Sequence, residues 1–116
     1  MARYASRPGY NWQMPTNDLP IACSLDGGAL AGRTSALRAS VLADAQSVER
    51  LPDGYRWRFI SGGDLFTRLG AVIDAERQCC RFLRFVIDAD PALGTVTIEV
   101  TGPAGTADFL ESWIAR

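Results

Sequence analysis

The chain contains no histidine and no lysine, so all twelve of its basic side chains are arginines. Without imidazole, the chain alone cannot build a Ser-His-Asp or Cys-His catalytic unit or a three-histidine zinc site. Without lysine, it cannot form a Schiff base with a carbonyl substrate or supply the lysine of a phosphate-binding loop. The remaining reactive groups are cysteine, carboxylate, arginine, tyrosine and hydroxyl side chains.

The charges of the chain nearly cancel, because twelve arginines stand against thirteen acidic side chains and leave a net charge of −1. No basic field would attract nucleic acid, so we expect no nucleic-acid partner. No segment has the apolar run that a secretory signal or a membrane span requires, so we expect no membrane partner and a cytoplasmic location. Thiols stay reduced in the cytoplasm.

The length of 116 residues suits one domain with its own core. Prolines and Gly9 interrupt every periodic pattern in residues 1–20, which predicts an extended N-terminal arm, and residues 21–116 then form a single two-layer domain. Tyr10, Trp12 and Met14 in the arm are large and apolar, so we expect them to pack on the domain or on a second subunit of a homodimer.

The hydrophobic pattern predicts an α/β (α+β) fold in the order β-α-β-α-β-β-α. Strands are expected at residues 21–25, 55–59, 85–88 and 95–100, and helices at residues 28–50, from the cap at 61–64 to Leu83, and from 101–103 onward. Such an alternation favours a two-layer sandwich, with a four-stranded mixed sheet and three helices mainly on one face. Residues 102–105 lack the glycine spacing and the lysine of a phosphate loop, and no motif indicates an organic cofactor.

Glu76 is the anomaly in the second expected helix, because it lies on the apolar stripe that contains Leu69, Val72 and Leu83. A buried carboxylate is costly unless a cation, a metal or several hydrogen-bond donors satisfy it. Arg33 lies on a similar stripe of the first expected helix and would be its partner in a buried ion pair. The alternative is that Glu76 is a metal ligand or a base, with Arg33 orienting it from the second shell of the site.

Two adjacent cysteines, Cys79 and Cys80, follow Glu76 by one helical turn, and Cys23 is the third cysteine of the chain. If the strand that carries Cys23 lies beneath the second helix, the three thiolates form a cup. Such a cup suits a soft ion such as Cu(I), Hg(II) or As(III), and Zn²⁺ would also fit with Glu76 as a fourth ligand. The alternative is three buried core cysteines without a role.

Residues 76–85, together with residues 97–103, resemble a set of small uncharacterised bacterial proteins with an E-x-x-C-C-x-F-L motif. Residues 21–26 match the cysteine that this set carries in its first strand, so the resemblance spans roughly residues 21–115. Some members are associated with heavy-metal or arsenic resistance, and the resemblance therefore implies soft-metal chemistry. This chain departs from the pattern at Arg81, where proline is common.

Three classes of function remain open. The first is a small cytoplasmic protein that binds a soft metal or metalloid ion through Cys23, Cys79 and Cys80, with Glu76 as a ligand. The second is a thiol-dependent redox or transfer enzyme, in which Arg77, Arg81 or Arg84 lowers the pKa of a cysteine. The third is a non-catalytic self-association module with structural cysteines, in which the arm and the aromatic strand make the contact.

Overall fold

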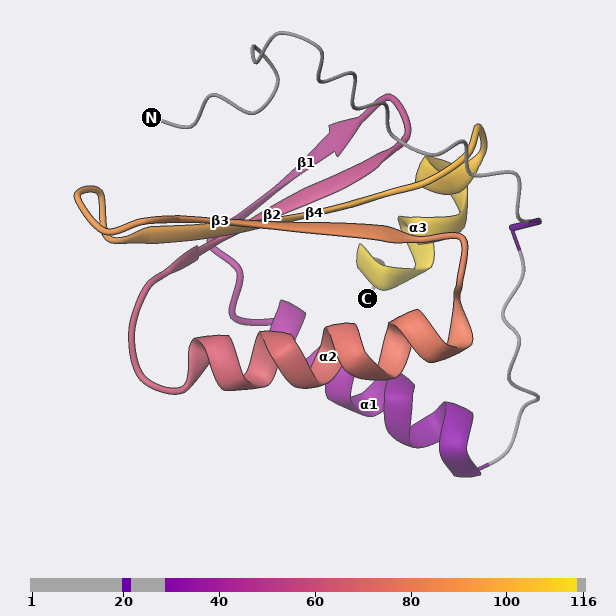
Figure 1. Cartoon of the computed structure of the whole chain (residues 1–116), viewed down its shortest axis with the longest axis horizontal. Helices are drawn as coiled ribbons and strands as arrows, with labels where there is room; N and C mark the ends of the chain where they lie inside the picture. The colour runs from indigo at the N-terminus through magenta and orange to yellow at the C-terminus, as the bar shows by residue number, and fades with distance from the viewer. Residues whose placement is uncertain (1–19, 22–28, 115–116) are drawn as a thin grey trace, which may run out of the picture.

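The computed structural model describes residues 20–21 and 29–114, and the expectations for the N-terminal arm and for Cys23 lie outside these residues. Within the described residues, seven elements follow one another (Figure 1). Their bounds are α1 Ala29–Leu42, β1 Ser47–Leu51, β2 Gly54–Ile60, α2 Leu65–Cys79, β3 Arg84–Asp90, β4 Thr95–Thr101 and α3 Thr106–Ile114.

The four strands form one sheet in the order β1-β2-β4-β3, and all three neighbouring pairs are antiparallel. Tyr55, Trp57 and Phe59 alternate along β2 with more exposed residues and are buried, as the period-two pattern predicts. In the register of the sheet, Trp57 lies opposite Ile98 of β4, which lies opposite Ile87 of β3. The three helices lie largely on one side of this sheet (Figure 1), so the α+β class with two layers is confirmed.

The first half of the fold differs from the prediction in one respect. The helix expected over residues 28–50 ends at Leu42, and Ser47–Leu51 is instead an edge strand that forms a hairpin with β2. Leu51 pairs with Gly54, so Pro52 and Asp53 form a two-residue turn. The described order is thus α-β-β-α-β-β-α, and the sheet is antiparallel throughout rather than mixed. The strand expected at residues 21–25 lies outside the described residues except for Ile21, which is not in a strand.

The fold contains the same unit twice, although the sequence shows no internal repeat. Each unit is a helix followed by a hairpin, α1-β1-β2 and then α2-β3-β4, and the inner strands β2 and β4 join the two hairpins. The second unit agrees closely with the sequence pattern, because the expected strands 85–88 and 95–100 lie within β3 and β4. The C-terminal helix α3 packs against β2.

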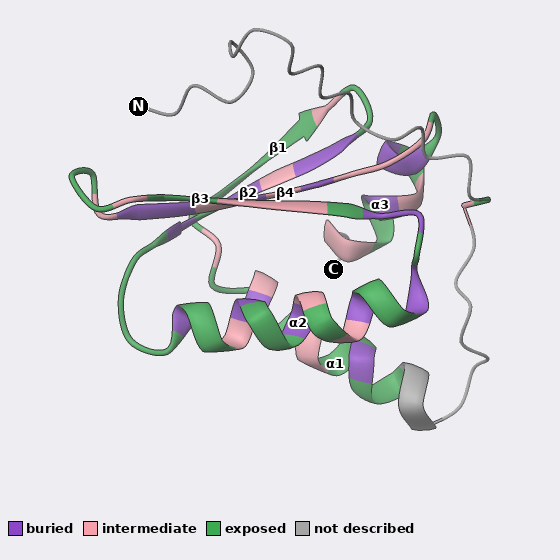
Figure 2. Ribbon diagram, in the orientation of Figure 1, coloured by how far each residue is buried: buried purple, intermediate pink, exposed green. Residues whose placement is uncertain are grey.

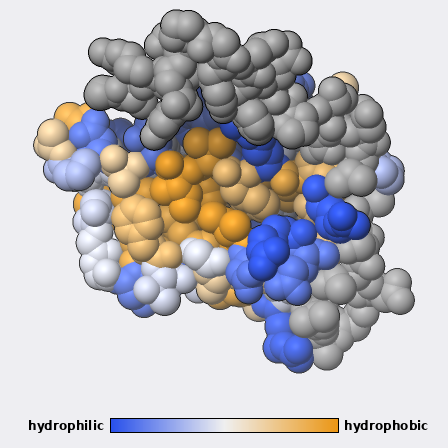
Figure 3. Space-filling model, viewed as in Figure 1, coloured by the Kyte–Doolittle hydropathy of each residue, from blue (hydrophilic) through white to orange (hydrophobic). Residues whose placement is uncertain are grey.

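The hydrophobic core lies between the sheet and the helices, where Trp57, Phe59, Phe82, Leu69 and Leu110 are buried almost completely. Figure 2 shows buried residues along the inner strands and at intervals along α2, as expected for one inward helix face. On the viewed side, hydrophobic side chains gather in the middle of the molecule beside the edge strand β3 (Figure 3). Within the described residues, no helix is long and apolar enough to cross a membrane.

Candidate thiol and ion-pair site

Glu76 lies on the buried face of α2, between the apolar residues Val72 and Cys79 of the same face. It is 1% exposed, so the prediction that it faces inward is confirmed. A carboxylate in this position needs a charged or hydrogen-bonding partner, because desolvation of an unpaired charge is costly.

The partner of Glu76 is Arg38 of α1. Its guanidinium Nη1 lies 2.7 Å from Oε2 of Glu76, and the two side chains are 18% and 2% exposed, respectively. A buried ion pair between the first two helices is therefore present, but the prediction of Arg33 as its cation is wrong. Thr34 and Val41 are buried and mark the inner face of α1, and Arg33 lies roughly 100° around the helix from Thr34 and is exposed.

Arg38 is held by a second contact besides the carboxylate. Its guanidinium carbon lies 4.5 Å from the ring centroid of Trp113 in α3, which is a cation–π geometry. The ring of Trp113 lies 6.1 Å from that of Trp57 in β2. Arg38 thus links α1, α2 and α3, and the indole of Trp113 fixes the direction from which the guanidinium approaches Glu76.

The helix α2 ends at the two adjacent cysteines. Cys79 is its last residue, and Cys80 leaves the helical conformation with φ −114° and ψ 77°. The expected extension of the helix to Leu83 is therefore wrong by one turn. The backbone N–H of Cys80 still donates to the carbonyl of Glu76 at 2.6 Å, and the N–H of Leu83 donates to the carbonyl of Cys80 at 3.1 Å. These bonds fix the turn that carries the thiols.

Phe82 anchors this turn to the rest of the domain. It is 0% exposed, and its ring meets that of Phe109 in α3 edge to face, with 5.1 Å between centroids. The residues that the E-x-x-C-C-x-F-L pattern specifies are all buried here, namely Glu76, Cys79, Cys80, Phe82 and Leu83. The motif therefore encodes the inward side of the end of α2 and of the turn after it.

Cys80 is a free, buried thiol beside the ion pair. Its Sγ lies 3.8 Å from Oε1 of Glu76, whereas Arg38 donates to the other carboxylate oxygen, Oε2. Burial, followed by the negative charge of Glu76, raises the pKa of the thiol from its ordinary value near 9.0 to about 11, although Arg38 opposes this shift. The thiol is thus protonated at neutral pH and donates its hydrogen towards the carboxylate.

Cys79 takes part in a disulfide. Cys23 lies outside the described residues, so its expected place in a three-thiolate cup stays a prediction. Among the described residues, no three cysteine, aspartate or glutamate side chains are grouped so that they could hold a metal ion. The structure therefore brings Glu76 and Cys80 together, and it places Cys79 next to them in the chain as an oxidised residue.

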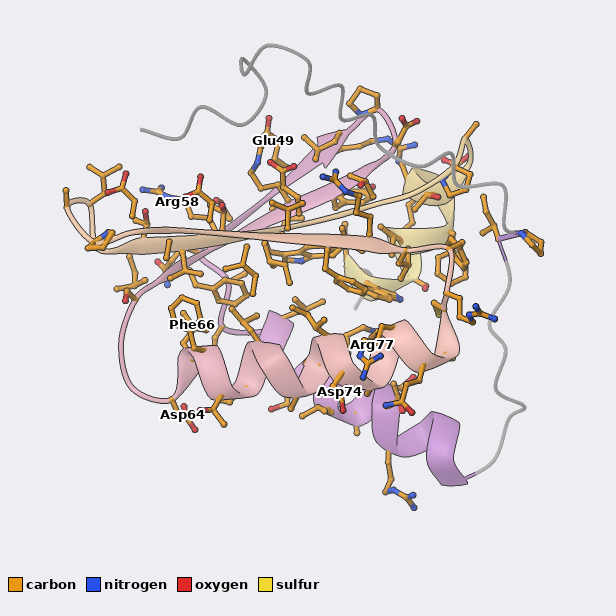
Figure 4. All side chains as sticks on the ribbon, in the orientation of Figure 1. Glu49, Arg58, Asp64, Phe66, Asp74 and Arg77 are labelled. Carbon is orange, nitrogen blue, oxygen red and sulfur yellow. The ribbon has the colours of Figure 1, made fainter. Side chains whose placement is uncertain are left out.

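The three arginines expected to activate the thiols do not act on Cys80. Arg77 pairs with Asp74 on the exposed side of α2, with 2.7 Å between nitrogen and oxygen (Figure 4). Arg81 and Arg84 are exposed, and Arg38 is the cation that lowers the pKa of Cys80. Since the net shift of that pKa is upward, the expectation of a thiolate favoured by these arginines is wrong for Cys80.

Sequence reasoning missed Arg38 and Trp113 as parts of the site. A signal for Arg38 was present, because it follows Thr34 by four residues and precedes Val41 by three, which places it on the inner face of α1. For Trp113 no signal was available, since its contact with Arg38 depends on how α3 docks.

Comparisons of the chain with protein-family models, with curated proteins and with solved structures give no match. Any function must therefore be argued from the geometry of these residues.

Proposed function

We propose that the reduced protein binds a soft metal or metalloid ion at the end of α2 through the sulfurs of Cys79 and Cys80. The observation that carries this proposal is the Sγ of Cys80, 3.8 Å from the buried carboxylate of Glu76 and next in the chain to a second buried cysteine. Sulfur ligands beside a carboxylate in an apolar surrounding favour soft ions over Mg²⁺ or Ca²⁺, which require oxygen ligands.

The ion is Cu(I), Hg(II), As(III) or Zn²⁺. Thiolates alone suit the first three, whereas Zn²⁺ would use a fourth ligand, for which Oε1 of Glu76 points towards Cys80. Because Oε2 of Glu76 accepts a hydrogen bond from Arg38 at 2.7 Å, the carboxylate is oriented before any ion arrives. Cys80 must lose its proton when it becomes a ligand, so binding releases protons to the solvent.

The third ligand in this proposal is Cys23. Cys79 is in a disulfide and Cys80 is free, whereas the place of Cys23 stays a prediction from the sequence. Reduction of the disulfide would return the sulfur of Cys79 as a thiol, next in the chain to the free thiol of Cys80. We propose a cytoplasmic location, where thiol buffers keep the protein in this reduced, binding state.

Replacement of single ligands tests the proposal. Reduced wild-type protein and the variants Cys23→Ser, Cys79→Ser and Cys80→Ser are titrated anaerobically with Cu(I) and with arsenite, each against a competing chelator or dithiol. We expect each serine variant to lose at least tenfold in affinity, because a hydroxyl is a poor ligand for soft ions. Equal affinities in wild type and in the triple serine variant would refute the proposal.

Glu76→Gln separates the two roles of the carboxylate. A role as ligand predicts weaker Zn²⁺ binding by a folded protein, whereas a role as ion-pair partner alone predicts lower stability with unchanged Zn²⁺ affinity. Glu99→Gln is the matched control, because Glu99 also pairs with an arginine, Arg56, at 2.6 Å but lies in β4 rather than in α2.

A second candidate function is thiol-disulfide exchange, and the disulfide of Cys79 beside the free thiol of Cys80 favours it. In this case the reduced cysteines would pass two electrons to a substrate disulfide and become oxidised themselves. With a pKa of about 11, however, Cys80 is a thiolate in only about one molecule in ten thousand at pH 7. Catalytic reduction of insulin by the protein, with Cys80→Ser inactive, would favour this candidate over ion binding.

The third class of function is a self-association module that makes its contact through the N-terminal arm and the aromatic strand. The aromatic strand does not offer such a surface. Tyr55, Trp57 and Phe59 of the aromatic strand are buried against the core of their own chain. A homodimer formed through the N-terminal arm stays a prediction, and sedimentation of the full chain and of a variant that lacks residues 1–18 tests it.

A further inference from the structure

A cavity of about 500 Å³ lies between the C-terminal half of α1, the hairpin β1-β2 and the end of α3. The described residues that line it are the indoles of Trp57 and Trp113 and five aliphatic side chains, among them Ala39, Leu42 and Val48. Val48 is 41% exposed, although it lies in the same row of the sheet as the buried Trp57 and Ile98. The cavity thus leaves one end of the core layer open.

The described part of the lining is chemically uniform. None of the described residues that line the cavity carries a charge or a hydroxyl group. One wall is formed by the partly exposed indole of Trp113, and Trp57, which is 1% exposed, lies behind it with 6.1 Å between the ring centroids. Such a wall favours a flat aromatic molecule, because tilted and offset ring contacts add to the gain from burial of apolar surface.

We propose that this cavity binds a small, uncharged aromatic molecule of one or two fused rings. Its volume lies in the range of roughly 300–1,000 Å³ that is typical of small-molecule sites. A protein partner would instead need about 800 Å² of surface on each side, which a cavity of this kind does not offer. The proposal goes beyond ion binding and uses none of the cysteines.

The cavity shares one residue with the surroundings of the ion pair. Trp113 lines the cavity and also lies under the guanidinium of Arg38, 4.5 Å from its centroid. A bound aromatic molecule would touch the indole without displacing Arg38, because the guanidinium is held by Glu76 at 2.7 Å. The indole N–H groups of Trp57 and Trp113 therefore report on occupancy of the cavity separately from the thiols.

Indole is a suitable probe, because it is flat, uncharged and soluble at millimolar concentration. The full-length protein, labelled with ¹⁵N, is titrated with indole, and the Nε1–H signals of Trp57 and Trp113 are followed by NMR. Ala39→Phe places a ring at an exposed position of α1 that lines the cavity, so it should fill the cavity without disturbing the core. Ala71→Phe makes the same change at an exposed position of α2 away from the cavity.

We expect saturable shifts of both indole signals in wild type and in Ala71→Phe, and at least a tenfold weaker affinity in Ala39→Phe. The triple serine variant should bind indole as wild type does, so failure of the ion-binding proposal would leave this one intact. Three results would overturn the inference. The first is the absence of saturable shifts in wild type, and the second is an equal affinity in Ala39→Phe. The third is that the same signals move with protein concentration alone, which would assign the cavity to a second copy of the chain.

Discussion

Replacement of Arg38 by methionine should destabilise the protein far more than the loss of a surface ion pair does. The substitution keeps an aliphatic stem on Trp113 and removes the charge that faces Glu76, which is 1% exposed and would be left buried without its cation. Loss of one partner from a fully buried pair costs about 3–5 kcal/mol. Since the Arg38 side chain is 18% exposed, we expect the lower end of this range, about 3 kcal/mol.

Arg68→Met is the matched control. Arg68 and Asp44 also lie 2.7 Å apart, but their side chains are 30% and 56% exposed, so the loss of this pair should cost at most about 1 kcal/mol. Urea unfolding followed by circular dichroism, with the disulfide intact in every sample, measures both changes. Arg38→Met should also lower the melting temperature by roughly 10 °C or more.

A double-mutant cycle with Glu76→Gln tests whether the cost comes from the pair itself. In the Glu76→Gln background, Arg38→Met does not leave a buried carboxylate without its cation. Arg38→Met should therefore lower the free energy of unfolding much less in this background than in wild type. Equal losses of stability for Arg38→Met and Arg68→Met, or an unchanged cost in the Glu76→Gln background, would refute the reasoning that burial makes this pair important.

Three further predictions concern the thiols and the backbone. Because the pKa of Cys80 is raised to about 11 in the folded protein, the unfolded chain loses this proton first as pH rises. The free energy of unfolding should therefore fall by about 2–3 kcal/mol between pH 9 and 11 relative to Cys80→Ala. Parallel urea-unfolding curves of the two proteins over this range would count against the buried thiol. Thiol titration of the unfolded, oxidised protein should find about one free thiol, because a disulfide uses two of the three cysteines, whereas three before reduction would show that Cys79 is not bonded. Gly54→Ala should destabilise by roughly 1–3 kcal/mol, because an added Cβ would overlap the carbonyl oxygen of Val100, whereas Gly70→Ala in α2 has open space and should stabilise by about 0.5–1 kcal/mol. Equal thermal shifts for the two glycine variants would contradict this account of Gly54.

The sequence predicted the second half of the fold better than the first half. In α2, the spacing of Leu65, Leu69 and Val72 leaves little choice of inward face, and the burial of Glu76 followed from it. Near residue 50, the run Pro52-Asp53-Gly54 predicts the end of a helix, although the same residues suit a tight hairpin turn. Val48 fits a helical stripe as well as a strand, so local spacing could not decide between them.

Some features of the candidate site could also be predicted from the sequence, and others could not. That Glu76 is buried and needs a cation could be predicted, because both statements depend on one helix and on the cost of desolvation. Which arginine supplies the charge depends on how α1 packs on α2, because Arg33 and Arg38 lie roughly 140° apart around the helix. The upward shift of the pKa of Cys80 also depends on burial in three dimensions, which the neighbouring arginines in the sequence do not indicate.

Elemental analysis of the protein in two redox states tests the central proposal most directly. Oxidised and fully reduced wild-type protein are dialysed anaerobically against the same limiting concentration of arsenite or Cu(I), and the bound ion is measured per chain. We predict that the reduced protein retains about one ion and releases protons as it binds, whereas the oxidised protein, with one free thiol at Cys80, retains almost none. Equal retention by the two states, or retention by neither, would contradict a soft-ion site built on these cysteines.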